Sequence, residues 1–142
     1  MSTALRDLKL WQESVALAGD VIRTARAAAR REIKVLTDRL IIAACAVPEA
    51  VAEAHGHYDP HDRQRAYRQA RRALLVLETD LAIARQAELF SASVLAKLTG
   101  RTATVSRLLS GYLAYLERHI DAGGTIASAN NSLEPTGISI EP

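Results

Sequence analysis

The segment that decides the fold is residues 60–87, PHDRQRAYRQARRALLVLETDLAIARQA, whose apolar residues recur at alternating spacings of three and four. This spacing places them along one side of an α-helix, where they form a continuous stripe that packs against other helices. The stripe consists of Tyr67, Ala70, Leu74, Leu77, Leu81 and Ala84. Leu75, Val76 and Ile83 lie outside it, which indicates that a second face of this helix is also buried in an assembly.

Three further segments show the same helical spacing, over about residues 7–30, 32–54 and 92–121. The stripe of the first, which we expect to face the core, is Leu8, Trp11, Val15, Ala18, Ile22, Ala25 and Ala29. A second stripe beside it, which hints at self-association, is Leu10, Leu17, Val21 and Ala28. The core stripe of the 32–54 segment is Leu36, Leu40, Ala43, Val47, Ala50 and Ala54. The core stripe of the 92–121 segment is Leu95, Leu98, Thr102, Val105, Leu109, Tyr112, Leu116 and His119.

Cap and turn residues mark the ends of these helices. Asp59 is expected to cap the helix of residues 60–87, because its side chain accepts hydrogen bonds from free backbone N–H groups. Gly56 is expected to take a positive φ just past the preceding helix. Ser91 is expected to cap the last helix, and Gly123-Gly124 to end it.

The composition fits a single helical domain. Of the 142 residues, 49% are hydrophobic and only 4% are aromatic, so the core must be aliphatic and rich in alanine. No segment alternates apolar and polar residues in the manner of a strand. Residues 1–122 are predicted to form the domain, and residues 123–142, rich in Ser, Asn, Gly and Pro, a disordered tail. The predicted fold is all-α: an antiparallel up-down-up-down four-helix bundle.

The sequence also predicts a cytoplasmic protein. Its longest apolar stretch, residues 40–47, is far too short to span a bilayer, so no membrane partner is expected. Charged residues near the start, such as Arg6 and Lys9, interrupt the apolar run that a secretory signal needs. Cys45 is the one cysteine, which excludes an internal disulfide and a structural zinc site built on cysteines. Its apolar neighbours predict a buried, inert thiol.

Two groups of basic residues stand out against a net charge of only +2. We predict that they bind the phosphates of RNA or DNA, because the planar guanidinium donates two hydrogen bonds to one phosphate. The alternative is a solvated surface with scattered ion pairs, since Glu32, Asp38 and Asp62 lie nearby in the sequence. The candidate nucleic-acid-binding residues are Arg23, Arg26, Arg30, Lys34, Arg65, Arg68 and Arg72.

Catalytic and metal-binding patterns are weak, so we expect no enzyme and no cofactor. Residues 55–62 hold three histidines and two aspartates, but this loop is more typical of a polar surface turn than of a metal site. No glutamate has a histidine three residues later, as a di-metal bundle needs. The nucleophile elbow and the Gly-rich phosphate loop are missing as well.

Four phrases in this order resemble one family. The chain is similar to the small bacterial four-helix-bundle proteins encoded in intervening sequences of 23S rRNA genes. The resemblance covers about residues 7–120 and depends on the combination, because no single phrase is specific. The phrases are Asp7-Leu8-Lys9-Leu10-Trp11-Gln12, Leu36-Thr37-Asp38-Arg39-Leu40, Val47-Pro48-Glu49-Ala50-Val51-Ala52-Glu53 and Leu77-Glu78-Thr79-Asp80-Leu81.

The resemblance implies a homo-oligomeric ring, commonly a homopentamer. The family that the chain resembles includes the accessory protein of diversity-generating retroelements. That relative binds nucleic acid and a reverse transcriptase through a basic surface. This chain departs from the family in its basic residues. Ile41 and Ile42 stand where relatives often carry paired arginines, and Arg71 and Arg72 stand where relatives tend to have a small or apolar residue. A family binding surface therefore does not transfer position by position.

These observations predict a non-enzymatic accessory protein that binds nucleic-acid phosphates through arginine-rich helix faces of an oligomeric ring. The alternative prediction is a structural module whose ring binds a protein partner and no nucleic acid. Strong salt dependence of binding separates the two, because phosphate contacts release counterions. The two predictions also differ in whether the arginines face solvent in the assembled ring. Arginines that pair with acids across subunit interfaces would not be available for phosphates.

Overall fold

The computed structural model describes the backbone of residues 4–27 and 34–129, and the surroundings of side chains as far as residue 122. Within these ranges all the regular secondary structure is helical, and there is no strand. The elements are the 3-10 turn η1 (Leu5–Asp7) and the helices α1 (Lys9–Ala27), α2 (Lys34–His55), α3 (Pro60–Gln86) and α4 (Ala92–Ala129).

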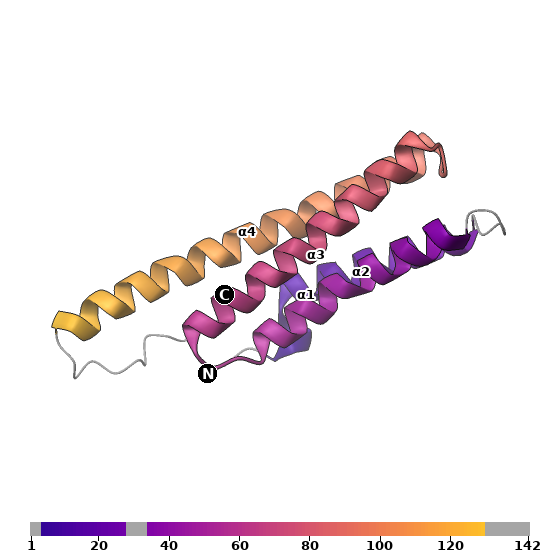
Figure 1. Cartoon of the computed structure of the whole chain (residues 1–142). Coiled ribbons are helices and arrows are strands. Elements are labelled where there is room, and N and C mark those ends of the chain that lie inside the picture. The colour runs from indigo at the N-terminus through magenta and orange to yellow at the C-terminus, as the bar shows by residue number, and fades with distance from the viewer. Residues whose placement is uncertain (1–3, 28–33, 130–142) are drawn as a thin grey trace.

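The four helices lie alongside one another in an elongated bundle (Figure 1). Each helix packs mainly on two others: α1 on α2, α2 on α3, α3 on α4, and α4 back on α1. This closed cycle places α1 and α3 at opposite corners of the bundle, as it does α2 and α4. The outward faces of α1 and α3 therefore belong to different sides of the molecule.

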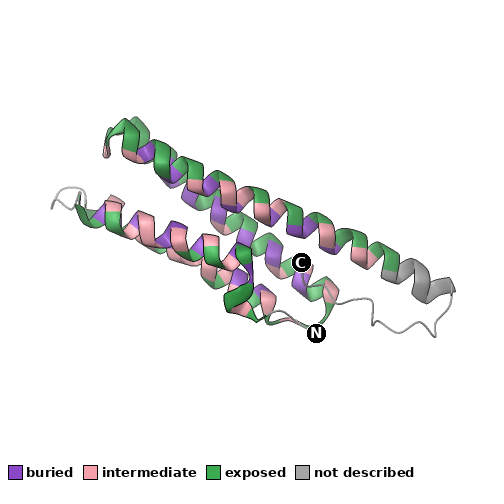
Figure 2. Cartoon of the chain, turned by 180° about the vertical axis from the view of Figure 1, so that it is seen from behind, coloured by how far each residue is buried: buried purple, intermediate pink, exposed green. Residues whose placement is uncertain are grey.

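The core lies between the helices and is built largely of leucine, valine and alanine (Figure 2). All six residues of the stripe predicted for α3 are buried, which confirms the predicted core face of this helix. In α4 the predicted stripe is buried as well, apart from His119, which is half-buried. Leu75, Val76 and Ile83 are exposed in the single chain, as expected for residues outside the α3 stripe.

The core face predicted for α1 is only partly confirmed. Leu8, Ala18 and Ala25 are buried as expected, but the other described residues of that stripe are not. Leu10, Leu17 and Val21, which were expected to lie outside the core, are buried in it. Val15 is 41% exposed instead, and Trp11 is only half-buried at the edge of the core. The physical reason is that two apolar stripes run side by side on this helix, and the neighbouring helices cover the stripe that contains Leu10, Leu17 and Val21.

A buried serine completes the core face of α1. Ser14 is fully buried between the leucines, and its hydroxyl donates a hydrogen bond of 3.0 Å to the Trp11 carbonyl within the helix. A hydroxyl satisfied in this way tolerates burial, because the cost of an unpaired polar group is avoided. The polar identity of Ser14 gave no signal that its side of α1 faces the core.

The prediction for α2 is partly confirmed. Leu40, Ala43, Val47 and Ala54 are buried, whereas Leu36 and Ala50 are half-buried. Their places in the core are taken by Thr37, Ala44 and Val51. Cys45 was expected to be buried, but its side chain is only half-buried, because it lies toward the outer side of α2.

The helix boundaries follow the predicted caps with two exceptions. Asp59 accepts a hydrogen bond of 3.0 Å from the Asp62 N–H, and Ser91 accepts one of 3.3 Å from the Val94 N–H, so both caps are confirmed. Gly56 does not take a positive φ, because its N–H still bonds to carbonyls of the last turn of α2. Gly123-Gly124 does not end α4, which continues to Ala129.

Other predicted boundaries fall outside the described residues. The first helix was expected to reach residue 30 and the second to begin near residue 32, and residues 28–33 lie between the described parts of α1 and α2. The predicted disordered tail overlaps the end of α4, and its residues 130–142 also lie outside the described part of the chain.

A buried guanidinium fastens three helices near the α2–α3 loop. Arg63 is 5% exposed, and its Nε and Nη2 atoms each donate a hydrogen bond of 2.9 Å, to the carbonyls of His57 and His55. Its Nη1 atom lies 3.5 Å from the Tyr112 hydroxyl on α4. The Tyr112 ring packs edge-on against Tyr67 of α3, with ring centroids 4.6 Å apart.

We predict that Arg63→Ala lowers the free energy of unfolding by about 3 kcal/mol, because carbonyls at the end of α2 lose charge-assisted hydrogen bonds, each of which contributes about 1.5–3 kcal/mol. Urea unfolding followed by circular dichroism measures this loss. The matched control is Arg65→Ala, two residues away, whose exposed ion pair contributes about 0.5 kcal/mol. Equal losses in both variants would contradict the role assigned to Arg63.

We predict that Gly100→Ala and Gly111→Ala each stabilise the bundle by about 0.5–1 kcal/mol. Both glycines lie inside α4, and an added Cβ would meet no atom within 4 Å, so only the backbone entropy of the unfolded chain changes. Thermal unfolding of each variant measures the effect. A fall in melting temperature would show that these positions are covered in solution.

Candidate nucleic-acid interface

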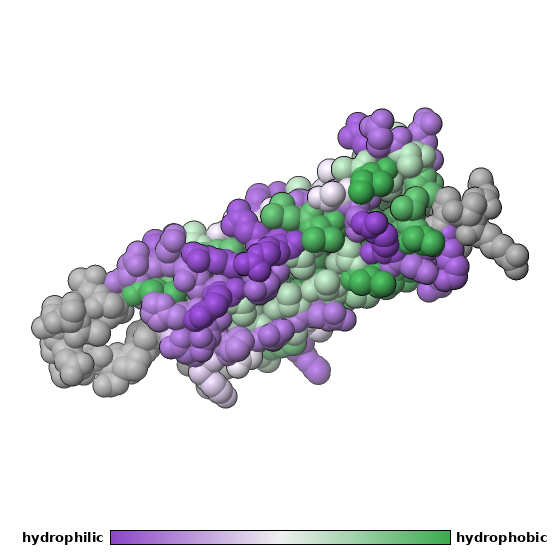
Figure 3. Space-filling model, viewed as in Figure 1, coloured by the Kyte–Doolittle hydropathy of each residue, from purple (hydrophilic) through white to green (hydrophobic). Residues whose placement is uncertain are grey.

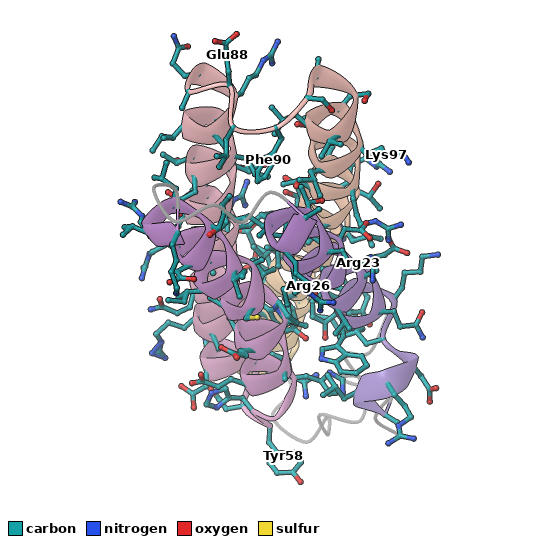
Figure 4. The ribbon with its side chains drawn as sticks, turned by 90° about the vertical axis from the view of Figure 1, so that its right-hand side faces the viewer. Arg23, Arg26, Tyr58, Glu88, Phe90 and Lys97 are labelled. Atoms are coloured by element: carbon teal, nitrogen blue, oxygen red, sulfur yellow. The ribbon has the colours of Figure 1, made fainter. Side chains whose placement is uncertain are left out.

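The predicted basic residues of α1 and α2 are exposed, and two of them are paired with acids on their own helix. Arg23 forms an ion pair with Asp20, and Lys34 Nζ lies 2.8 Å from an oxygen of Asp38. Arg26 is exposed near the end of α1, close to Arg23 (Figure 4). The fourth residue of this predicted group, Arg30, lies outside the described residues.

Asp20 does not serve Arg23 alone. Its second carboxylate oxygen lies 2.6 Å from Nε of Arg101 on α4, and Arg101 also reaches Glu13 at 3.6 Å. These contacts hold α4 against α1. Asp20 therefore has a structural partner besides Arg23, and the surroundings of Arg23 are close to neutral.

The predicted basic residues of α3 form a row along its outer side, which we call the α3 arginine row: Arg65, Arg68 and Arg72. All three are exposed. Arg65 pairs with Asp62 at 3.0 Å, and Arg72 donates a hydrogen bond of 2.8 Å to the side-chain oxygen of Gln69. Arg68 makes no ion pair within the described part of the chain. The row therefore keeps an excess of positive charge.

The structure does not bring the two predicted groups together. α1 and α3 occupy opposite corners of the bundle, so Arg23 and Arg26 lie on a different side from the α3 arginine row. One short nucleic-acid segment cannot contact both groups on one chain. The α3 group has fewer competing acids, and it is the better candidate for a phosphate-binding face.

Two more exposed arginines, Arg71 on α3 and Arg107 on α4, were not predicted as site residues. Arg71 is exposed, and it lies between Tyr67, which packs on Tyr112 of α4, and Ala82, which lines a groove with Ala103 of α4. Arg71 is therefore level with the part of α4 between Ala103 and Tyr112, which carries the exposed Arg107. The helical pattern of α3 could have identified Arg71, but Arg107 required the packing register of α3 on α4.

The groove beside this region lies between α3 and α4 and has a volume of about 980 Å³. Small side chains of α4 form much of it, and Phe90 lies between the ends of the two helices (Figure 4). Glu78, Arg85 and Glu88 supply its charges. The described residues that line the groove include neither a histidine nor a cysteine, so it offers no pairing of a nucleophile with a histidine base.

The histidine-containing loop of residues 55–62 serves as a helix connection. Its carbonyls at His55 and His57 bind Arg63, and Asp59 caps α3. Among the residues that the structure describes, no group of three or more His, Cys, Asp or Glu side chains is arranged to hold a metal ion.

Exposed apolar side chains gather on another surface, which we call the apolar α2–α3 face: Val35, Ile42, Leu75, Val76 and Ile83. Ile42 is 70% exposed and Val76 is 54% exposed. Figure 3 shows hydrophobic side chains over the part of the molecule where the first half of α2 runs beside the second half of α3. An ion pair of 3.1 Å between Arg39 and Asp80 joins the two helices there.

None of the described helices is both long enough and apolar enough to cross a bilayer. The most apolar helix, α2, carries charged residues such as Asp38 and Glu49 on its outer side.

Comparison with known proteins identifies the family. The family model of the 23S rRNA-intervening sequence protein matches residues 6–111, which is most of the chain. The chain therefore belongs to this family, as the four phrases of its sequence had indicated. A comparison with curated proteins found no match.

Proposed function

We propose that this member of the 23S rRNA-intervening sequence protein family is a non-enzymatic accessory protein that binds the phosphates of RNA or DNA. The observation that carries the proposal is the α3 arginine row. Its side chains are exposed, and Arg68 has no acidic partner among the described residues. Arg71, next to Arg72 on the same helix, adds positive charge.

The ion pair between Arg65 and Asp62 does not oppose binding. An exposed arginine–aspartate pair on one helix contributes only about 0.3–0.5 kcal/mol, so Arg65 exchanges Asp62 for a phosphate at little cost. A guanidinium binds phosphate through two parallel hydrogen bonds, which adds geometric fit to charge. Such contacts read no base sequence, so the binding is expected to be general and sensitive to salt.

The finer features of the assembly are also proposals. The short connections between α2, α3 and α4 favour antiparallel neighbours in up-down-up-down order. We propose a homo-oligomeric ring, a pentamer by family resemblance, that works in the cytoplasm without a catalytic centre or cofactor. A ring repeats the α3 arginine row in every subunit, and linked weak contacts add up through effective concentration.

A second candidate function is a protein-interaction module without nucleic-acid binding. The apolar α2–α3 face supports it, because large apolar side chains gathered on one surface are typical of protein contacts. If the face is used for self-association, it supports the ring of the first proposal. If it binds another protein, the partner is expected to present apolar side chains. Among them we expect a charged side chain that pairs with Arg39 or Asp80.

We predict that Arg68→Ala/Arg72→Ala weakens binding to duplex RNA and DNA and lowers the slope of log K against log salt by about 2. The slope changes by about 0.9 for each phosphate that the protein no longer neutralises. Fluorescence anisotropy over a salt series measures both quantities. The control is Arg23→Ala/Arg26→Ala, which removes the same charge from the opposite corner of the bundle and is expected to change the slope little.

Equal effects of the two double variants would show that net charge, and not the α3 arginine row, determines binding. Absence of binding by the unmodified protein at low salt would contradict the nucleic-acid proposal itself. The second candidate function would then be preferred.

We predict that Ile42→Glu/Val76→Glu converts the oligomer to a smaller species while the helices remain folded. The change places two carboxylates in an apolar contact, where burial of unpaired charge is strongly unfavourable. Light scattering with size-exclusion chromatography measures the mass, and circular dichroism checks the helices. The control, Ala114→Glu on the exposed side of α4, is expected to keep the mass unchanged, and an unchanged mass in both variants would exclude this face from the assembly.

A further inference from the structure

Tyr58 is an exception among the aromatic residues that the structure describes. Its side chain is 94% exposed, whereas the other described aromatic side chains are buried or half-buried. Figure 4 shows it projecting from the end of the bundle, away from all four helices. Nothing in the packing of the described residues explains a large aromatic residue at this position.

The backbone around Tyr58 is held in place on both sides. The carbonyls of His55 and His57 accept hydrogen bonds of 2.9 Å from the buried guanidinium of Arg63. On the other side, the Asp59 carboxylate caps α3 through the Asp62 N–H at 3.0 Å. The loop therefore presents the ring of Tyr58 from a fixed position, so little backbone entropy is lost when a ligand binds to it.

The loop leads directly into the α3 arginine row. Because a helix rises about 1.5 Å per residue, Arg65 lies about 8 Å and Arg72 about 18 Å from the start of α3 at Pro60. A strand whose phosphates lie along the row and continue toward the start of α3 arrives at Tyr58. The exposed ring thus stands at the end of a basic track, where the paired part of a nucleic acid could give way to an unpaired nucleotide.

We propose that Tyr58 is a stacking platform for an unpaired base of the nucleic acid whose phosphates bind the α3 arginine row. The inference rests on the proposed function and specifies its ligand as a duplex with a single-stranded end or loop. Phosphate contacts alone do not distinguish such a ligand from a blunt duplex. An aromatic face does, because only an unpaired base offers its own face for stacking, whatever its sequence.

The test compares two labelled probes in fluorescence anisotropy: a blunt RNA duplex and the same duplex with a five-nucleotide single-stranded overhang. The unmodified protein is expected to bind the overhang probe about tenfold more tightly, the effect of one stacked base. Tyr58→Ala is expected to remove this preference and to leave the affinity and salt slope for the blunt duplex unchanged. Tyr58→Trp is expected to keep the preference, because it retains an aromatic face.

Three results would overturn the inference while leaving the proposed function intact. They are a lack of preference in the unmodified protein, a preference that survives in Tyr58→Ala, and an equal loss of affinity for both probes. If Tyr58→Ala changes the oligomeric mass but keeps the preference for the overhang probe, the Tyr58 side chain instead forms a contact between protein chains. If the unmodified protein binds neither probe at low salt, the proposed function fails and the inference fails with it.

Discussion

The interaction on which the rest of the structure depends is the burial of the Arg63 guanidinium where α2 ends and α3 begins. A buried charge is tolerated only when its donors are satisfied, and here carbonyls of the α2–α3 loop accept from it. The same side chain reaches Tyr112 on α4, so one residue relates three helices. The position of the loop, the start of α3 and therefore the line of exposed arginines all follow from this arrangement.

Much of the fold was predictable because the apolar stripes of α3 and α4 have no competing interpretation. In each, the apolar spacing of three and four continues along the helix without interruption, and the structure buries that stripe apart from His119. The stripe of α1 was not predictable in the same way, because two apolar stripes run side by side and spacing alone does not rank them. The choice depended on which side of α1 the neighbouring helices cover, which the spacing within one helix does not show. In addition, the polar residue Ser14 lies on the buried side, where its hydroxyl is hydrogen-bonded, and its polarity made that side of α1 look exposed.

The candidate site shows the same division between local and long-range information. Spacing along α3 correctly indicated that Arg65, Arg68 and Arg72 share an exposed side, because that is a property of one helix. Whether those residues join the α1 arginines depends on which helices are neighbours in space, and the structure separates the two groups. Arg63 is a further basic residue of this segment, but its role is internal. Arg63 lies four residues before Tyr67, in line with the buried stripe, whereas Arg65 lies on the outer side of α3.

The single tryptophan has a consequence for optical work on this protein. Trp11 lies half-buried at the edge of the core, on the side of α1 that carries the exposed Val15. With one indole in 142 residues, all tryptophan emission reports from this one place. An indole that becomes fully shielded from water emits at shorter wavelength. The emission wavelength of Trp11 therefore reports, without an added label, when another molecule covers this side of α1.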